Sequence, residues 1–296
     1  MRAAVLRWSV GASRVLRTLG GLGALGALGA LVLSACVSHI GSTPVEAPPV
    51  NLLNTDTRRA GFADMSTALQ AMQQDDTLNP AMLWVREGEA FWSQAPASGP
   101  SCAGCHSSPT SQSQTGHPSA SIQTAATRHP AFDGTLNKPV TLAGRVDLCR
   151  QRHQNLKPQD ADGPEVLALS AWLMHQARGL PITPPPDPRL TAWTQRGEQL
   201  YGARMGQLNL ACTHCHDQYA GQRLGGAPIP QAHPTGYPTY RLEWQKLGSL
   251  PRRLRACMTG VRAEPFATGS DEWVALEGYL MTRAAGMTLE GAAVRP

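Results

Sequence analysis

Two short cysteine motifs carry the most specific chemistry in the sequence. Cys102-Ala-Gly-Cys105-His106 and Cys212-Thr-His-Cys215-His216 both follow the pattern Cys-x-x-Cys-His, in which the two thiols attach a c-type haem and the histidine binds its iron. A single match can arise by chance, and Cys-x-x-Cys alone also occurs in zinc sites and redox motifs. Two copies in one chain predict two covalently bound haem c groups. The predicted attachment residues are Cys102, Cys105, Cys212 and Cys215, and the predicted iron ligands are His106 and His216.

Two further cysteines stand at matching distances from these motifs. Cys149 lies 43 residues after His106, and Cys257 lies 41 residues after His216. Each precedes the last predicted helix of its unit, so we interpret both as the second axial ligands of the two irons, a role that thiolates fill in haem proteins. A disulfide is the usual expectation for a spare pair in an oxidising compartment, but it would join the two units and break their symmetry.

Other side chains fit the second axial position less well. Met174 and Met281 are equivalent in the two units, but both fall inside the predicted C-terminal helices, where core packing is the simpler interpretation. The long loops hold three histidines that share no pattern, and we interpret them as surface or haem-edge residues: His117, His129 and His233.

The surroundings of the two axial cysteines differ in charge. Residues 252–256, just before Cys257, contain three arginines and have a formal charge of +3, whereas residues 144–148 before Cys149 contain one arginine and one aspartate and have a formal charge of zero. Arg253 precedes Cys257 by one helical turn and shares its helix face. Such a field favours thiolate and attracts anionic substrates. We therefore predict that Cys257 and Arg253 are catalytic.

The arginine assignment leaves alternatives open. Arg145 holds the equivalent position before Cys149, so pairing with haem propionates explains one arginine at each haem. The sequence does not decide which of Arg252, Arg253 and Arg255 faces the iron. It also does not decide whether Arg241 and Arg262 join the cluster.

The chain repeats itself at offsets of 107 to 110 residues. Segments 84–89, 142–149 and 167–180 match segments 193–198, 250–257 and 274–287. In each of the two repeated units the sequence predicts, in this order, a helix, a haem motif, a long loop, a short helix that carries Cys149 or Cys257, and a C-terminal helix. This order predicts an all-α fold of two tandem class I cytochrome c-like domains, at residues 61–182 and 190–296. A proline-rich linker at 183–189 joins them.

The first 35 residues predict an export signal. Four arginines precede an apolar run that ends at Leu33-Ser-Ala-Cys36, which resembles a lipoprotein signal with a lipid anchor on Cys36. The alternatives are an uncleaved anchor or an ordinary signal with a chance cysteine. We expect a periplasmic protein, with a tether at 36–60 and a surface helix over 60–74. Without residues 1–35 the chain has 22 basic and 21 acidic side chains, which gives no support for nucleic-acid binding.

Over roughly residues 60–296 the chain resembles the SoxA family, the dihaem subunits of the SoxAX cytochromes of bacterial sulfur oxidation. Some members lack the first haem motif, which this chain has. In the first unit the resemblance rests on that motif and on 144–150. In the second unit it is strongest in six segments: Gly206–Cys212, Tyr237–Arg241, Arg253–Cys257, Val261–Pro265, Gly269–Ser270 and Leu276–Leu280.

The resemblance implies an L-cysteine S-thiosulfotransferase. Cys257 would carry an extra sulfur as a persulfide and ligate the second haem, and Arg253 would contact the sulfur substrate. Thiosulfate would be joined to a cysteine of the SoxYZ carrier, and two electrons would leave through haem to a downstream cytochrome. A monohaem cytochrome, SoxX, would be the partner subunit.

Two other functions are compatible with haem motifs. The first is a dihaem electron-transfer cytochrome in which Cys257 is a passive ligand. The second is a dihaem peroxidase, which predicts a histidine or methionine as distal ligand. The coupling of a thiol with a sulfur anion needs a nucleophilic sulfur, cationic neighbours and an electron acceptor in one place. Cys257, Arg253 and the second haem motif together supply these requirements.

Overall fold

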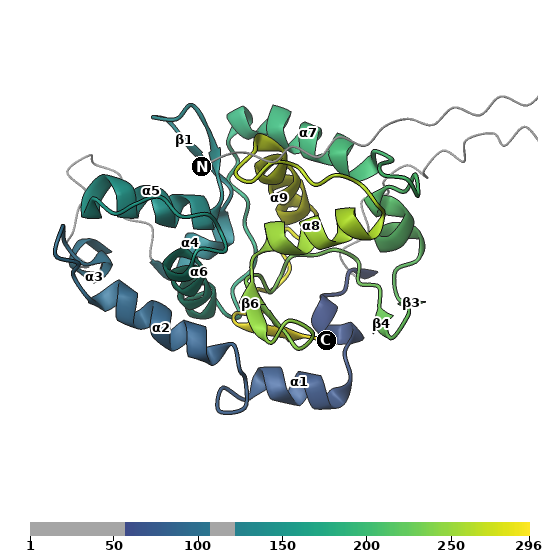
Figure 1. The fold of residues 1–296 in the computed structure, drawn as a ribbon, viewed down its shortest axis with the longest axis horizontal. Helices are drawn as coiled ribbons and strands as arrows, with labels where there is room; N and C mark the ends of the chain where they lie inside the picture. Colours follow the sequence, from purple (N-terminus) through teal and green to yellow (C-terminus); the bar gives the residue numbers. More distant parts are fainter. Residues whose placement is uncertain (1–56, 107–121) are drawn as a thin grey trace, which may run out of the picture. The chain divides into compact units, whose positions relative to one another are not determined.

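The computed structural model describes residues 57–106 and 122–296 (Figure 1). The predicted signal, Cys36, His117 and most of the predicted tether lie outside these residues. In the part of the chain that is described, no helix is both long and apolar enough to cross a membrane.

Helices make up most of the first repeat, and one hairpin precedes the helix that carries Cys149. Helix α1 (Thr67–Gln74) comes before the repeat. The elements that follow are α2 (Met82–Ser93), α3 (Cys102–His106), α4 (Ile122–Ala125), β1 (Ala131–Asp133), β2 (Lys138–Val140), α5 (Leu142–Gln154) and α6 (Pro164–Gln176).

The second repeat has the same order of main elements. They are α7 (Thr191–Gly202), a π-helical turn (His214–Gln218), β3 (Arg223–Leu224), β4 (Ala227–Pro228), β5 (Thr239–Arg241), β6 (Lys246–Gly248), α8 (Leu250–Gly260), α9 (Asp271–Arg283) and β7 (Ala293–Arg295). Helices dominate, as predicted, but the prediction of an all-α fold missed these short strands.

The hairpins β1–β2 and β5–β6 are equivalent in the two repeats. Both are antiparallel, with Asp133 opposite Lys138 in the first and Arg241 opposite Lys246 in the second. Each leads directly into the helix that carries the axial cysteine, α5 or α8. Asp133 and Arg241 therefore occupy the same position relative to Cys149 and Cys257.

Each repeat is built around one close helix crossing, of α2 with α6 and of α7 with α9 (Figure 1). A glycine lies at each crossing. A Cβ on Gly88 would lie 2.1 Å from the Ala168 carbonyl oxygen, and one on Gly197 would lie 2.0 Å from that of Ala275. Since backbone atoms cannot move aside as a flexible side chain can, any other residue would force the two helices apart.

The two repeats share contacts. Met281 of α9 belongs to the same buried cluster as Met174 of α6, so both methionines are core residues. Backbone hydrogen bonds also join the segment after α6 to the segment after α9. The Ile182 N–H donates to the carbonyl of Met287 at 2.9 Å, and the Gly286 N–H donates to the carbonyl of Ile182 at 2.8 Å. Residues of the second repeat thereby complete the packing of the first.

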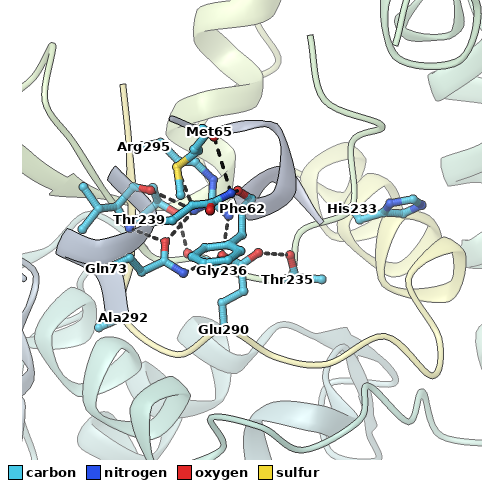
Figure 2. A network of polar contacts seen from close by, with 12 residues as sticks. Phe62, Met65, Gln73, His233, Thr235, Gly236, Thr239, Glu290, Ala292 and Arg295 are labelled. Carbon is cyan, nitrogen blue, oxygen red and sulfur yellow. Dashed lines mark hydrogen bonds and ion pairs between the residues drawn. The ribbon is translucent and has the colours of Figure 1, made fainter. Parts of the chain in front are cut away.

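Helix α1 is shorter than predicted and is not a simple surface helix. The Gln73 side chain is buried, and its Oε1 accepts hydrogen bonds from the Val294 N–H (2.9 Å) and the Arg295 guanidinium (2.7 Å). Its Nε2 donates to Glu290, which also pairs with Arg295 at 2.6 Å. Figure 2 shows this network, which fixes α1 against β7.

Candidate active site

A cavity in the second repeat brings the predicted catalytic residues together. Its empty volume is about 910 Å³, including space open to solvent, and its lining includes His216, Arg253 and Cys257. Much of the remaining wall is apolar, with Leu250, Leu254, Leu280 and several prolines. Largely apolar walls with a few convergent polar groups are typical of cofactor and ligand sites.

His216 presents one ring nitrogen for metal binding. It lies in the π-helical turn, and its Nδ1 is 2.7 Å from the carbonyl oxygen of Pro230, which also lines the cavity. Because a carbonyl only accepts, Nδ1 donates this bond, and Nε2 is the ring nitrogen that remains to bind a metal. Metal-ligating histidines commonly have their second nitrogen fixed in this way.

Cys257 lies against His216 in the same cavity. Burial raises the pKa of the Cys257 thiol, but the hydrogen bond with His216 and the positive charges of Arg253 and Arg241 outweigh it. The net pKa lies below the ordinary cysteine value. The predicted thiolate character of Cys257 thus agrees with its surroundings.

Helix α8 sets the position of Cys257 and Arg253. Its N-cap is Ser249, whose Oγ accepts from the Arg252 N–H at 3.2 Å. The Ser249 N–H donates to Asp162 of the first repeat at 3.0 Å. The first repeat therefore helps to fix the start of the helix on which Arg253 and Cys257, one turn apart, face the cavity together.

The structure distinguishes the three arginines of α8, which the sequence did not. Only Arg253 lines the cavity. The Arg252 guanidinium lies over the Trp244 ring, 4.6 Å from its centroid, and Arg255 bonds the Thr268 hydroxyl at 3.3 Å. Arg253 has no ion-pair partner within the described ranges, so its charge is directed at the cavity.

Of the two more distant arginines, only one joins Arg253. Arg241 lines the cavity, with its side chain 9% exposed and its Nε 2.8 Å from Glu243. Arg262 instead borders a separate shallow groove beside Met258. The cavity lining therefore holds three guanidinium groups: Arg253 of α8 and Arg241 of β5, which act on Cys257, and Arg295 of β7, which pairs with Glu290.

In the first repeat, Cys149 lies near the haem-attachment cysteines. Burial raises the pKa of Cys102, and the neighbouring Cys149 raises it further. Burial also raises the pKa of Cys149 above the ordinary value, despite the opposing influence of Arg145 and Arg152. The two predicted axial cysteines thus differ in the direction of their pKa shifts.

One buried carboxylate contributes to the electrostatic difference between the sites, besides the burial of Cys149 and the hydrogen bond of Cys257 with His216. Asp133 is 4% exposed and pairs with Arg145 at 2.7 Å and Arg152 at 3.1 Å. The Leu136 N–H, together with these arginines, holds the pKa of Asp133 well below its usual range. In the second repeat the equivalent residue is Arg241, so a neutralising acid in one site is replaced by a cation in the other.

The remaining candidates are placed as follows. His106 packs against Trp92, with ring centroids 5.4 Å apart, and the loop after it lies outside the described residues. His129 donates from Nδ1 to the Ala125 carbonyl at 2.8 Å. His233 is buried rather than at the surface; it lines the cavity and donates to the Arg59 carbonyl at 2.9 Å. In the described part of the chain, neither Cys149 nor Cys257 forms a disulfide.

The second site fits a covalently attached haem. His216 and Cys257 offer a nitrogen and a sulfur ligand in one cavity. Cys212 packs against the same hydrophobic cluster as Tyr237 and Leu254, two residues of the cavity wall. The donor set and the apolar wall are those of a c-type haem pocket.

Comparison with known proteins agrees with this site. The SoxA/TsdA cytochrome c domain model matches residues 87–182 and 196–289. The chain is 31% identical to L-cysteine S-thiosulfotransferase subunit SoxA of Pseudaminobacter salicylatoxidans over 242 residues, covering 81% of this chain and 82% of the relative. It is 30% identical to the subunit of the same name from Paracoccus pantotrophus, covering 86% and 87%.

A solved structure is similar as well. The crystal structure of SoxXA from P. pantotrophus matches with a TM-score of 0.73 and 28% sequence identity, over 81% of this chain and 87% of that chain. Both haem motifs and most of both repeats lie within the matched family segments. The chain therefore belongs to the SoxA/TsdA family of c-type cytochromes, and its relatives are the SoxA subunits of L-cysteine S-thiosulfotransferases.

Proposed function

We propose that the protein is the SoxA-type subunit of an L-cysteine S-thiosulfotransferase, which joins thiosulfate to a cysteine of a SoxYZ carrier. The observation that carries this proposal is the unpaired Arg253 beside Cys257 and His216 in one cavity. A plain electron carrier needs the two ligands, and pairing with a haem propionate accounts for one arginine, whereas Arg253 and Arg241 both line the cavity beside Cys257. The names of the relatives support the same activity.

The reaction forms one S–S bond and is an oxidation. The terminal sulfur of thiosulfate bonds to the carrier cysteine, the thiol proton is released, and two electrons leave. A haem held by His216 and Cys257 would supply the electron acceptor through which these electrons leave toward a downstream cytochrome. Arg253 offsets the charge of the incoming dianion, and the positive charges of Arg253 and Arg241 beside Cys257 favour the thiolate form of that residue.

We also propose that each repeat is a class I cytochrome c domain with one haem. The first haem would be held by Cys102, Cys105, His106 and Cys149. The second would be held by Cys212, Cys215, His216 and Cys257. The solved SoxXA neighbour supports a SoxX cytochrome as partner, and the predicted export signal supports a periplasmic location.

A reconstituted assay tests the proposed activity. We expect the holoprotein with its partner to reduce an added c-type cytochrome only when both thiosulfate and the carrier are present. The carrier peptide should gain the mass of a thiosulfonate group. Arg253→Lys keeps the charge but loses the planar fork of donors. It should lower kcat/KM for thiosulfate roughly 10- to 100-fold, the value of one charge-assisted hydrogen bond.

The matched control is Arg255→Lys, because Arg255 does not line the cavity. The Arg255→Lys variant should keep the wild-type kcat/KM for thiosulfate. Cytochrome reduction without any change in carrier mass would instead establish a simple electron-transfer protein and reject the proposed activity.

A further inference from the structure

Tyr237 presents a hydroxyl to the cavity that the haem ligands do not use. The residue is half-buried and lines the cavity with Arg241, Arg253 and Cys257. Its ring packs against the hydrophobic cluster of the second repeat. Its hydroxyl has no hydrogen-bond partner among the residues that the structure describes. Burial raises the pKa of this hydroxyl against the opposing influence of Arg253 and Arg241, so it remains a donor at neutral pH.

Arg241 has donors to spare beside this hydroxyl. Its Nε is bonded to Glu243 at 2.8 Å, and its guanidinium lies over Trp244, 5.3 Å from the ring centroid. Both terminal nitrogens are without a partner in the described ranges. The strand β5 holds Arg241 rigidly between β6 and β7, which fixes the direction of these donors.

The equivalent residues of the first repeat are arranged differently. Tyr237 and Arg241 correspond to His129 and Asp133, each pair standing at the same place before and within a hairpin. His129 is bonded to the Ala125 carbonyl, and Asp133 is bonded to Arg145. In the first repeat both positions are thus engaged within the repeat. In the second they place one hydroxyl and one guanidinium in the cavity lining beside Arg253, and the other charged lining residues, Asp64 and Arg295, are paired with Arg59 and Glu290.

We propose that Tyr237 and Arg241, together with Arg253, bind the sulfonate oxygens of thiosulfate and orient its terminal sulfur beside Cys257. A sulfonate group has three oxygens and carries negative charge, which matches one hydroxyl donor and two cationic forks. The inference rests on the proposed function, because it concerns the substrate of the same site. Haem propionates are the other anions that the same donors can bind.

Tyr237→Phe in the holoprotein with its partner and carrier tests this assignment. We expect the KM for thiosulfate to rise about 10- to 100-fold, since a hydrogen bond to an anion is lost, and kcat to change less than about threefold. The visible spectrum and the reduction potential of the haem should not change. Tyr219→Phe is the matched control, because Tyr219 is 45% exposed and does not line the cavity, and it should leave the KM unchanged.

Two results would overturn the assignment. An unchanged KM would show that Tyr237 does not bind the substrate. A shifted haem potential with an unchanged KM would show that its hydroxyl binds a haem propionate instead. Should Tyr237→Phe lose haem during maturation, Arg241→Lys offers the same comparison of KM with haem potential. A parallel Cys257→Met variant distinguishes a failure of the proposed function from a failure of the present inference alone. If it retains turnover, the proposed function fails; if it loses turnover while Tyr237→Phe behaves as wild type, only the present inference fails.

Discussion

Replacing Cys257 by methionine is expected to abolish thiosulfate coupling while the second haem remains attached. Methionine can still ligate haem iron, and Cys212 and Cys215 still provide the covalent bonds. The sulfur anion beside Arg253 is lost, however. Turnover should fall by roughly three orders of magnitude or more, as expected when a nucleophilic group is removed. The assay is carrier modification by thiosulfate, with the haem content checked by absorption spectroscopy.

The matched control for this variant is Cys149→Met. Asp133 neutralises the arginines around Cys149, and burial raises the pKa of the Cys149 thiol. We therefore expect no catalytic role for Cys149. The variant should keep turnover within about threefold of wild type, and the potential of one haem should rise because thiolate ligation lowers it. An equal loss of turnover in both variants, with folding intact, would contradict the division of labour between the repeats.

Removing the attachment cysteines of one repeat should remove one haem. We expect the wild-type chain to carry two haems, and the double variant Cys212→Ala, Cys215→Ala to carry one and to have no coupling activity. Both the electron acceptor and the ordered position of Cys257 beside it would be lost. The measurements are the mass of the intact chain and its haem-to-protein ratio.

The corresponding variant of the first repeat, Cys102→Ala with Cys105→Ala, is the natural comparison. It should also retain one haem, now the one in the second repeat. A wild-type chain with a single haem, or a second-repeat variant that still turns over, would be incompatible with the proposed haem assignment.

The motif spacing and the repeat were sufficient to predict the main helices and the grouping of His216, Arg253 and Cys257 in one site. Chemistry at these positions depends on residue type and on local helix geometry, both of which are visible in a sequence. The short strands were missed because a strand of two or three residues has too few positions to show alternation.

The decisive contrast between Asp133 and Arg241 also escaped prediction. Both residues lie at the same repeat offset, but their relation to Arg145 and Arg253 depends on how the hairpin folds back beside the following helix. Such long-range pairing is set by tertiary packing rather than by local pattern. The burial of Gln73 has the same origin, because its partners Glu290 and Val294 are more than 200 residues away.

The most direct test of the central claim is the mass of the peptides that carry Cys257 and Cys149, taken from holoprotein that has been exposed to thiosulfate without carrier. If Cys257 is the reacting sulfur, its thiolate should attack the terminal sulfur of thiosulfate, break the S–S bond and release sulfite. Its peptide should then show a substantial fraction with the added mass of one sulfur atom, and the Cys149 peptide should show none. A Cys257 peptide that is always unmodified, or equal modification of both cysteines, would contradict the assignment of the chemistry to the second repeat.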